Sequence, residues 1–89
     1  MQKPIEDRIG MILKALSYLL PTLNLSFDLS IDHKDQRIII RVVYETIDGS
    51  RKILSETINI DYVLLSDKTA EEIASEVFER LQHRLTFAI

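Results

Sequence analysis

The chain has 89 residues, of which 46% are hydrophobic and 28% are charged, and its formal net charge at pH 7 is −3. These values are typical of one small soluble domain, and we expect residues 1–89 to form it. The acidic balance disfavours nucleic acid and anionic membranes as partners, because both are bound through an excess of Lys and Arg. The absence of Cys excludes disulfides, thiolate nucleophiles and thiolate metal sites. No stretch has the length of a membrane span and the first residues do not resemble a signal peptide, so we expect a cytoplasmic protein.

The first predicted element is an amphipathic helix between Pro4 and Pro21. Apolar residues recur there at helical spacing, and polar residues form the opposite stripe. Proline is accepted in the first turn of a helix but cannot continue one, so the two prolines mark its start and its end. The apolar side consists of Ile5, Ile9, Ile12, Leu13, Leu16, Leu19 and Leu20.

Residues 23–32 predict the first strand, because apolar and polar side chains alternate strictly along them. A polar turn at residues 33–36 precedes a second strand at residues 37–47. Apolar residues occupy the odd positions of the first strand and the even positions of the second. The register must therefore place odd positions opposite even ones, so that both apolar sets lie on one face of the sheet.

A loop of two or four residues between these strands satisfies that rule. It brings apolar residues together on the inner face and carboxylates opposite arginines on the outer face. The charges agree with a register chosen only for the core, which supports the antiparallel pairing. The opposed residues are Leu29 with Ile40, Phe27 with Val42, Asp28 with Arg41, and Asp32 with Arg37.

Asp48 and Gly49 mark the turn into a third strand at residues 52–62, with Tyr62 on its apolar face. A three-residue loop that ends at Gly49 keeps the apolar positions of this strand in the core, with Gly49 in the left-handed conformation. Glu56 is the exception to the apolar pattern, and we expect it to lie at the sheet edge or to be turned outward by a bulge. The opposed residues are Val42 with Leu54 in the core, and Val43 with Ile53 on the outer face.

The last predicted element is a helix that begins near residues 66–69. Thr69 and Glu72 form a capping-box pattern, and Ser66 and Asp67 are rival caps. We expect the apolar chain end, residues 85–89, to be docked on the domain. The apolar stripe of this helix consists of Ala70, Ile73, Ala74, Val77, Phe78, Leu81 and Leu85.

The order of these elements predicts an α+β fold, α-β-β-β-α, in which both helices pack on one face of a three-stranded antiparallel meander. This order resembles the double-stranded-RNA-binding domain. That family contacts RNA through a Lys-rich start of its second helix and a Gly-Pro-His type loop between its first strands. Residues 66–72 and 33–36 stand at these two places, and the first of them has one Lys among three acids. The resemblance therefore extends to topology alone.

Residues 23–81 are also similar to flagellar FlaG-type proteins. The shared features are an amphipathic helix, a short hairpin, and a strand that reads Arg-Ile-Ile-Ile-Arg-Val-Val at residues 37–43. Those proteins have Ile-Pro-Pro after the hairpin, where this chain has Ile58-Asn59-Ile60. Neither likeness contains a specific motif, and likeness of fold does not determine function.

The acidic cluster at the first turn, formed by Asp28, Asp32 and Asp35 with His33, is of a kind that can hold Ca²⁺ or Mg²⁺. Two of these carboxylates have arginine partners in the expected register, and the loop lacks the ligand spacing and glycine of an EF-hand. Neither His33 nor His83 belongs to an arrangement of nucleophile, base and orienting group. There is also no glycine-rich phosphate loop. We therefore expect a non-enzymatic protein with no catalytic residue, no metal and no cofactor.

The outer face of the predicted sheet has apolar residues at positions where solvent-facing side chains are normally polar. Such patches are typical of protein interfaces, although Ile and Val are also common strand formers. We expect a protein-interaction module, an adaptor, assembly or regulatory protein of bacterial or phage origin, which docks another protein or forms a homodimer. The candidate interface residues are Ile39, Val43, Ile47 and Ile53 in the sheet, and Leu85, Phe87 and Ile89 at the chain end.

Two alternatives remain open at this stage. The first is nucleic-acid binding by a strip of basic residues on the sheet, which the neighbouring acids disfavour. The second is a small ligand held in a pocket between the helices and the sheet. The basic strip consists of Arg37, Arg41, Arg51 and Lys52.

Overall fold

The computed structural model describes residues 5–88, and for residues 5 and 6 it describes the backbone alone. A three-stranded antiparallel sheet in the order β1-β2-β3 is preceded and followed by helices. The expected α+β class and α-β-β-β-α order are therefore confirmed. The elements are α1 (Ile5–Leu19), η1 (Leu20–Leu23), β1 (Ser26–Asp32), β2 (Arg37–Glu45), β3 (Arg51–Asn59), α2 (Ile60–Leu65) and α3 (Ala70–Ala88).

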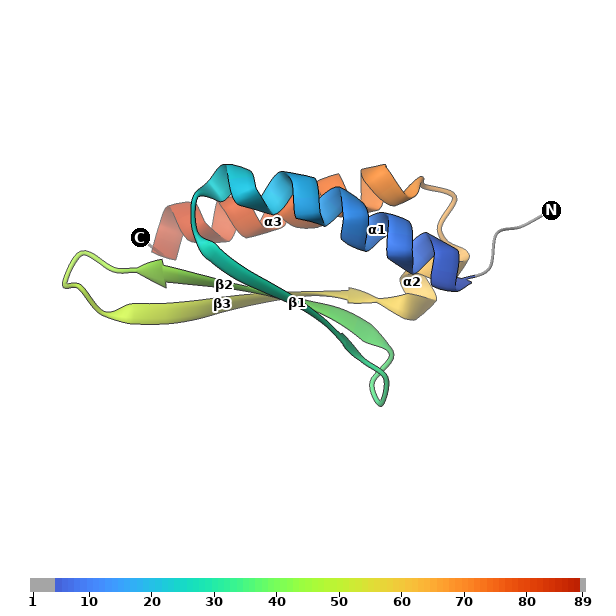
Figure 1. Cartoon of the computed structure of the whole chain (residues 1–89), viewed down its shortest axis with the longest axis horizontal. Helices are drawn as coiled ribbons and strands as arrows, with labels where there is room; N and C mark the ends of the chain where they lie inside the picture. The colour runs from blue at the N-terminus through green and yellow to red at the C-terminus, as the bar shows by residue number, and fades with distance from the viewer. Residues whose placement is uncertain (1–4, 89) are drawn as a thin grey trace.

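The two long helices lie on the same face of the sheet (Figure 1). α1 and α3 pack side by side over it, and within residues 5–88 no helix covers the opposite face, which we call the outer face. The core fills the space between the helices and the inner face of the sheet. Its most deeply buried side chains are Ile12, Leu16, Leu20, Ile38, Ile40, Val42, Val63, Ile73, Val77 and Leu81.

The first helix ends where proline predicts. α1 stops at Leu19, and Pro21 lies in the 3₁₀ turn η1 that follows, because a proline cannot donate the next helical hydrogen bond. Asn24 then takes the left-handed conformation at φ 56°, and β1 begins at Ser26 rather than at residue 23. The expected start of the helix at Pro4 lies outside the described residues.

The predicted register of β1 on β2 is confirmed. Apolar residues oppose one another on the inner face, and the outer face has both expected ion pairs. The Asp28 carboxylate lies 3.0 Å from Nη1 of Arg41, and the Asp32 carboxylate lies 3.3 Å from Nε of Arg37. The opposed apolar residues are Phe27 with Val42, Leu29 with Ile40, and Ile31 with Ile38.

Asp32 also closes the turn between these strands. Its Oδ1 accepts hydrogen bonds from the backbone N–H groups of Asp35 and Lys34, at 3.2 and 3.1 Å. The N–H of Asp35 is the main cause that holds the pKa of Asp32 below its ordinary value, with Arg37 and Lys34 acting in the same direction. This carboxylate therefore acts as a turn-forming group.

The second hairpin has the expected three-residue loop. The N–H of Thr46 donates to the carbonyl of Ser50 at 2.9 Å, which leaves residues 47–49 as the loop. Gly49 has φ 85°, the left-handed conformation that the loop requires. Val42 opposes Leu54 and Val43 opposes Ile53, as predicted, although β2 ends at Glu45 and not at residue 47.

The prediction that the third strand continues to residue 62 is wrong. β3 ends at Asn59, whose side-chain Oδ1 accepts the N–H of Asp61 at 2.8 Å and caps the short helix α2. Tyr62 consequently lies on this helix and is partly exposed, not in the core. The alternation of Ile58, Asn59 and Ile60 resembles a strand, but the asparagine acts as a helix cap.

The capping box of the last helix is confirmed. The N–H of Glu72 donates to Oγ1 of Thr69 at 3.2 Å, and Oε1 of Glu72 accepts the N–H of Thr69 at 3.4 Å. The helix then continues to Ala88, so residues 85–88 are its last turn. Leu85 and Ala88 pack on the core, as expected of a docked chain end, whereas Phe87 is exposed. No helix within the described part of the chain is long and apolar enough to cross a membrane.

Candidate functional site

The outer face of the sheet brings several of the predicted interface residues together. Val43 and Ile53 are directly opposed on β2 and β3, and Ile39 lies on the same face of β2. Ile53 is 62% exposed, and the other two are partly exposed. We call these three residues the outer apolar patch.

Arg41 lies between Ile39 and Val43 on the same face of β2. Its guanidinium is paired with Asp28 on the neighbouring strand β1, with Nη1 3.0 Å from the carboxylate. Ile39 itself is flanked across the sheet by the uncharged residues Ser30 and Thr57. Arg41 therefore separates Ile39 from Val43 along β2, and its charge is paired on the β1 side of the outer apolar patch.

The other predicted interface residues lie elsewhere. Ile47 is at the tip of the second hairpin and is 95% exposed. Leu85 is buried in the core, while Phe87 is 78% exposed and packs edge-on to the ring of His83, with ring centroids 5.0 Å apart. These two residues belong to α3, on the opposite side of the sheet from the outer apolar patch. Ile89 lies outside the described residues.

The basic strip considered for nucleic-acid binding is divided. Arg37 pairs with Asp32 and with Asp35, the latter at 3.7 Å, and Arg41 pairs with Asp28. Arg51 is exposed on the outer face, whereas Lys52 opposes Tyr44 and so points to the helix side. The basic strip therefore does not form one unpaired basic surface from its four residues, Arg37, Arg41, Arg51 and Lys52.

Glu56 is on the apolar face, as its position predicts, and the ladder continues through it without a bulge, opposite Ile40. Its side chain is only 15% exposed and is paired with two arginines of α3. Nη1 of Arg84 lies 2.8 Å from the carboxylate and Nε of Arg80 lies 3.8 Å from it. The same Nη1 donates to the carbonyl of Ser55 at 2.6 Å. These contacts join α3 to the edge strand β3.

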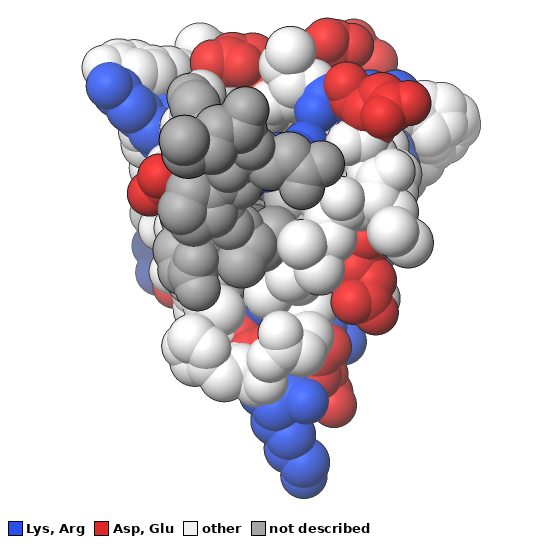
Figure 2. All heavy atoms as spheres, turned by 90° about the vertical axis from the view of Figure 1, so that its right-hand side faces the viewer, with Lys and Arg blue, Asp and Glu red and all other residues white. Residues whose placement is uncertain are grey.

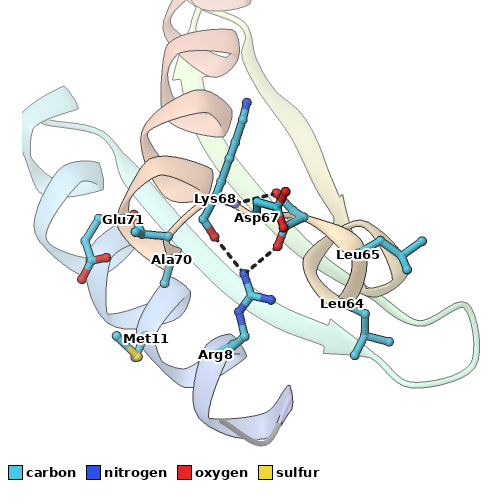
Figure 3. Close-up of a pocket in the computed structure, with 10 residues that line it drawn as sticks. Arg8, Met11, Leu64, Leu65, Asp67, Lys68, Ala70 and Glu71 are labelled. Atoms are coloured by element: carbon cyan, nitrogen blue, oxygen red, sulfur yellow. Dashed lines mark hydrogen bonds between the residues drawn. The ribbon is translucent and has the colours of Figure 1, made fainter. Parts of the chain in front are cut away.

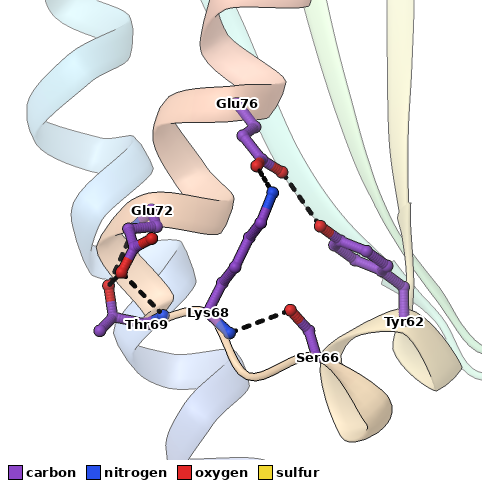
Figure 4. Close-up of polar contacts among 6 residues, drawn as sticks. All are labelled: Tyr62, Ser66, Lys68, Thr69, Glu72 and Glu76. Atoms are coloured by element: carbon purple, nitrogen blue, oxygen red, sulfur yellow. Dashed lines mark hydrogen bonds and ion pairs between the residues drawn. The ribbon is translucent and has the colours of Figure 1, made fainter.

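A second polar cluster joins α2 to α3 (Figure 4). Glu76 accepts a hydrogen bond from the hydroxyl of Tyr62 at 3.0 Å and forms an ion pair with Lys68. Oγ of Ser66 accepts the N–H of Lys68 at 3.1 Å and shapes the link between the two helices. The sequence pattern does not predict this cluster, because it places Tyr62 in a strand.

Arg8 of α1 binds the segment between α2 and α3 from the side of α1 (Figure 3). Its Nη1 donates to the carbonyl of Val63 at 2.6 Å, and its Nη2 donates to the carbonyl of Lys68 at 2.9 Å. A groove of about 590 Å³ lies here, bounded also by the exposed side chains of Leu64 and Leu65. Figure 2 shows this end of the molecule, where uncharged surface lies between acidic and basic side chains. The guanidinium is thus engaged in holding α1 against the α2–α3 link.

The acidic residues of the first turn serve the fold. Among the side chains that the structure describes, those of residues 7–88, no three of His, Cys, Asp or Glu gather closely enough to hold a metal ion. Asp48, at the second turn, accepts hydrogen bonds from the hydroxyl of Thr46 and from the N–H of Ser50, and these lower its pKa. The charged contacts described above thus close turns, cap helices or join elements.

Comparison with protein families, with curated proteins and with solved structures finds no match for this chain.

Proposed function

We propose that this chain is a non-enzymatic protein-interaction module that docks another protein on the outer face of its sheet. The observation that carries the proposal is the outer apolar patch, Ile39, Val43 and Ile53, on a face that no described helix covers. In this proposal the module acts as a cytoplasmic adaptor, assembly or regulatory protein of a bacterium or phage.

The geometry of the patch supports docking. In the ladder between β2 and β3, the opposed residues that are hydrogen-bonded to each other have even numbers, such as Thr46 and Ser50. Val43 and Ile53 therefore form a non-hydrogen-bonded pair, the kind in which opposed side chains lie closest. Complete burial of an Ile or Val side chain contributes about 1.5–3 kcal/mol. Three such residues with a charged rim match the usual arrangement of a small interface, in which apolar contacts give affinity and surrounding charges give orientation.

The charged rim favours a protein partner over nucleic acid. Arg37 and Arg41 are already paired with carboxylates on β1, so a phosphate would compete with those acids for each arginine. A partner protein with apolar side chains flanked by one acid and one base contacts the outer apolar patch and its charged neighbours, and the ion pairs of Arg37 and Arg41 stay intact.

The test is affinity purification from an extract of the cells that make the protein. The bait is the wild type, the double variant Ile39→Asp/Val43→Asp, or the milder variant Ile53→Asp. The last variant should remain folded, because the side chain of Ile53 is exposed. We expect at least one protein to be retained by the wild type and lost from both variants, because a buried unpaired carboxylate opposes docking.

The matched control is Leu65→Asp, which places the same charge at an exposed apolar residue of α2, in the groove beside Arg8 of α1. The control bait should retain the partner. Equal retention by the wild type and by Ile53→Asp would contradict the proposal.

A further inference from the structure

The hydrogen-bond pattern of the sheet shows which backbone groups point outward at its edges. At both ends of the β2–β3 ladder the bonded residues are even-numbered: Thr46 N–H donates to Ser50, and Ile60 N–H donates to Gln36, each at 2.9 Å. Bonded pairs alternate along an antiparallel ladder, so the even residues of β2 bond β3 and its odd residues bond β1. Each even-numbered residue of β1 lies opposite an odd-numbered residue of β2. The backbone N–H and C=O groups of the even residues of β1 therefore point to β2, and those of its odd residues point away from the sheet.

The outward residues of β1 are therefore Phe27, Leu29 and Ile31. No hydrogen bond within residues 5–88 reaches their backbone N–H or C=O groups. Their side chains point to the helix side, but the helices cover them incompletely: Phe27 is 37% exposed, and the other two are half-buried. Figure 1 shows that β1 diverges from α1 toward its hairpin end.

A groove follows from this divergence. It has a volume of about 320 Å³ and lies between Ile31 of β1 and the residues Ile9 and Leu13 of α1. Free backbone groups beside exposed apolar side chains are the two features that an added β-strand requires.

The β3 edge is different. Nη1 of Arg84 occupies the outward carbonyl of Ser55 at 2.6 Å, and the inward-pointing carboxylate of Glu56 holds that arginine in place. An inward-pointing charge and a covering side chain are common ways to block an edge strand. A strand that paired with β3 would have to displace Arg84.

We propose that two copies of this chain pair through their β1 strands, antiparallel, about a two-fold axis at Leu29. The outward groups of β1 belong to odd-numbered residues, so two β1 strands must pair odd residues with odd residues. A two-fold axis at Leu29 meets this condition, because each Leu29 then opposes the partner's Leu29. The two three-stranded sheets join into one sheet of six strands.

This register is also complementary in its side chains. On the helix side Phe27 opposes the partner's Ile31, an aromatic and β-branched pair of the kind that stabilises sheets, and the groove beside Ile31 receives that ring. On the outer face Asp28 opposes the partner's Ser30, so no like charges are directly opposed. The ion pair of Asp28 with Arg41 stays intact.

The pairing is closed. A two-fold contact uses the β1 edge of both copies, and the blocked β3 edges then prevent further addition, so the product is a dimer and not a fibre. The inference goes beyond the proposed docking function, because it uses a different surface. It also places the two outer faces on one continuous sheet, which gives a bivalent docking platform.

The test is the solution mass of the purified full chain by light scattering, measured over the widest accessible range of concentration. The wild type should reach twice the mass of one chain. The variant Phe27→Lys/Ile31→Lys should stay at the mass of one chain, because the register sets each introduced lysine directly against an introduced lysine of the partner. The charge-swap variant Phe27→Lys/Ile31→Glu should recover the dimer, because the same register then sets each introduced lysine against an introduced glutamate.

The charge-swap variant separates loss of pairing from loss of folding, since both variants replace the same two apolar residues. The outer-face variant Ile53→Asp should leave the dimer mass unchanged, which separates this inference from the docking proposal. A wild type that stays monomeric at every concentration, or a double-lysine variant that still dimerises, would overturn the inference and leave the docking proposal standing.

Discussion

The two edges of the sheet differ in how closely their residues follow the apolar pattern. β1 alternates apolar and polar side chains throughout, whereas β3 has a carboxylate, Glu56, at an inward position. The irregular strand is the protected one, because Glu56 binds Arg84 and Arg84 binds the edge carbonyl of Ser55. The regular strand is the open one. A residue that breaks an apolar pattern can therefore mark the edge of a sheet that is closed to other strands.

The largest expected effect comes from loosening the helix that protects β3. Leu81 of α3 is fully buried, and Leu81→Ala should lower the free energy of unfolding by about 2–5 kcal/mol, because it leaves a cavity. Urea denaturation measures this loss. The adjacent exposed residue provides the control, since Gln82→Ala should change the stability little. Equal effects of the two substitutions would mean that α3 is not packed as described.

A smaller effect is expected from removing the β3 block itself. Arg84→Met should lower the free energy of unfolding by about 1–2 kcal/mol, because Glu56 loses its closer partner and the Ser55 carbonyl loses its donor. The variant should also form species larger than the dimer in light scattering, since both edges are then open. The matched substitution Lys34→Met, at an exposed turn residue, should do neither. If Arg84→Met stayed dimeric, the arginine would not be what closes this edge.

The loop that aligns β3 on β2 gives the next effect. Gly49→Ala should destabilise the protein by about 1 kcal/mol, because an alanine resists the left-handed conformation at φ 85°. Gly10→Ala, in the exposed middle of α1, should instead stabilise it by up to about 1 kcal/mol. Apart from the flanking residues and the helix's own backbone, no described atom lies within 4 Å of an added Cβ at either site, so the opposite signs isolate backbone conformation. Thermal unfolding of both variants checks the pair.

The smallest effect is the acid sensitivity of the two hairpins. The pKa values of Asp32 and Asp48 are lowered in the folded state by hydrogen bonds from turn groups, the N–H of Asp35 and the hydroxyl of Thr46 first among them. Each carboxylate therefore adds stability above its unfolded pKa, and this stability is lost as the pH falls through the folded pKa. Asp32→Asn and Asp48→Asn should each reduce the slope of unfolding free energy against pH in the acid range. An unchanged slope in both variants would contradict these assignments.

Much of the fold was predictable from local patterns. The alternation of β1 and β2 predicted their register, and the two charge pairs on the outer face agreed with it. The capping box at Thr69 and the left-handed Gly49 were also predictable, because each depends on a few neighbouring residues. Fold class and strand order followed from these elements.

The remaining features depend on residues far apart in the sequence. Asn59 caps a helix within a pattern that otherwise resembles a strand, so the sequence pattern does not predict α2. Arg8 meets its carbonyl partners across 55 and 60 residues, and Glu56 meets Arg84 across 28. The incomplete cover over β1 depends on the path of α1 over the sheet, which no local pattern specifies. The outer apolar patch was predictable, but the open edge was not.

Amide hydrogen exchange, measured by NMR at low and at high protein concentration, tests the difference between the two edges most directly. The outward N–H groups of Phe27, Leu29 and Ile31 should exchange rapidly in the dilute protein and become protected as the concentration rises, because they donate to a partner strand in the dimer. The outward N–H groups of β3, such as those of Ile53 and Thr57, should not change. Protection that appears at β3, or exchange at β1 that does not depend on concentration, would contradict the account.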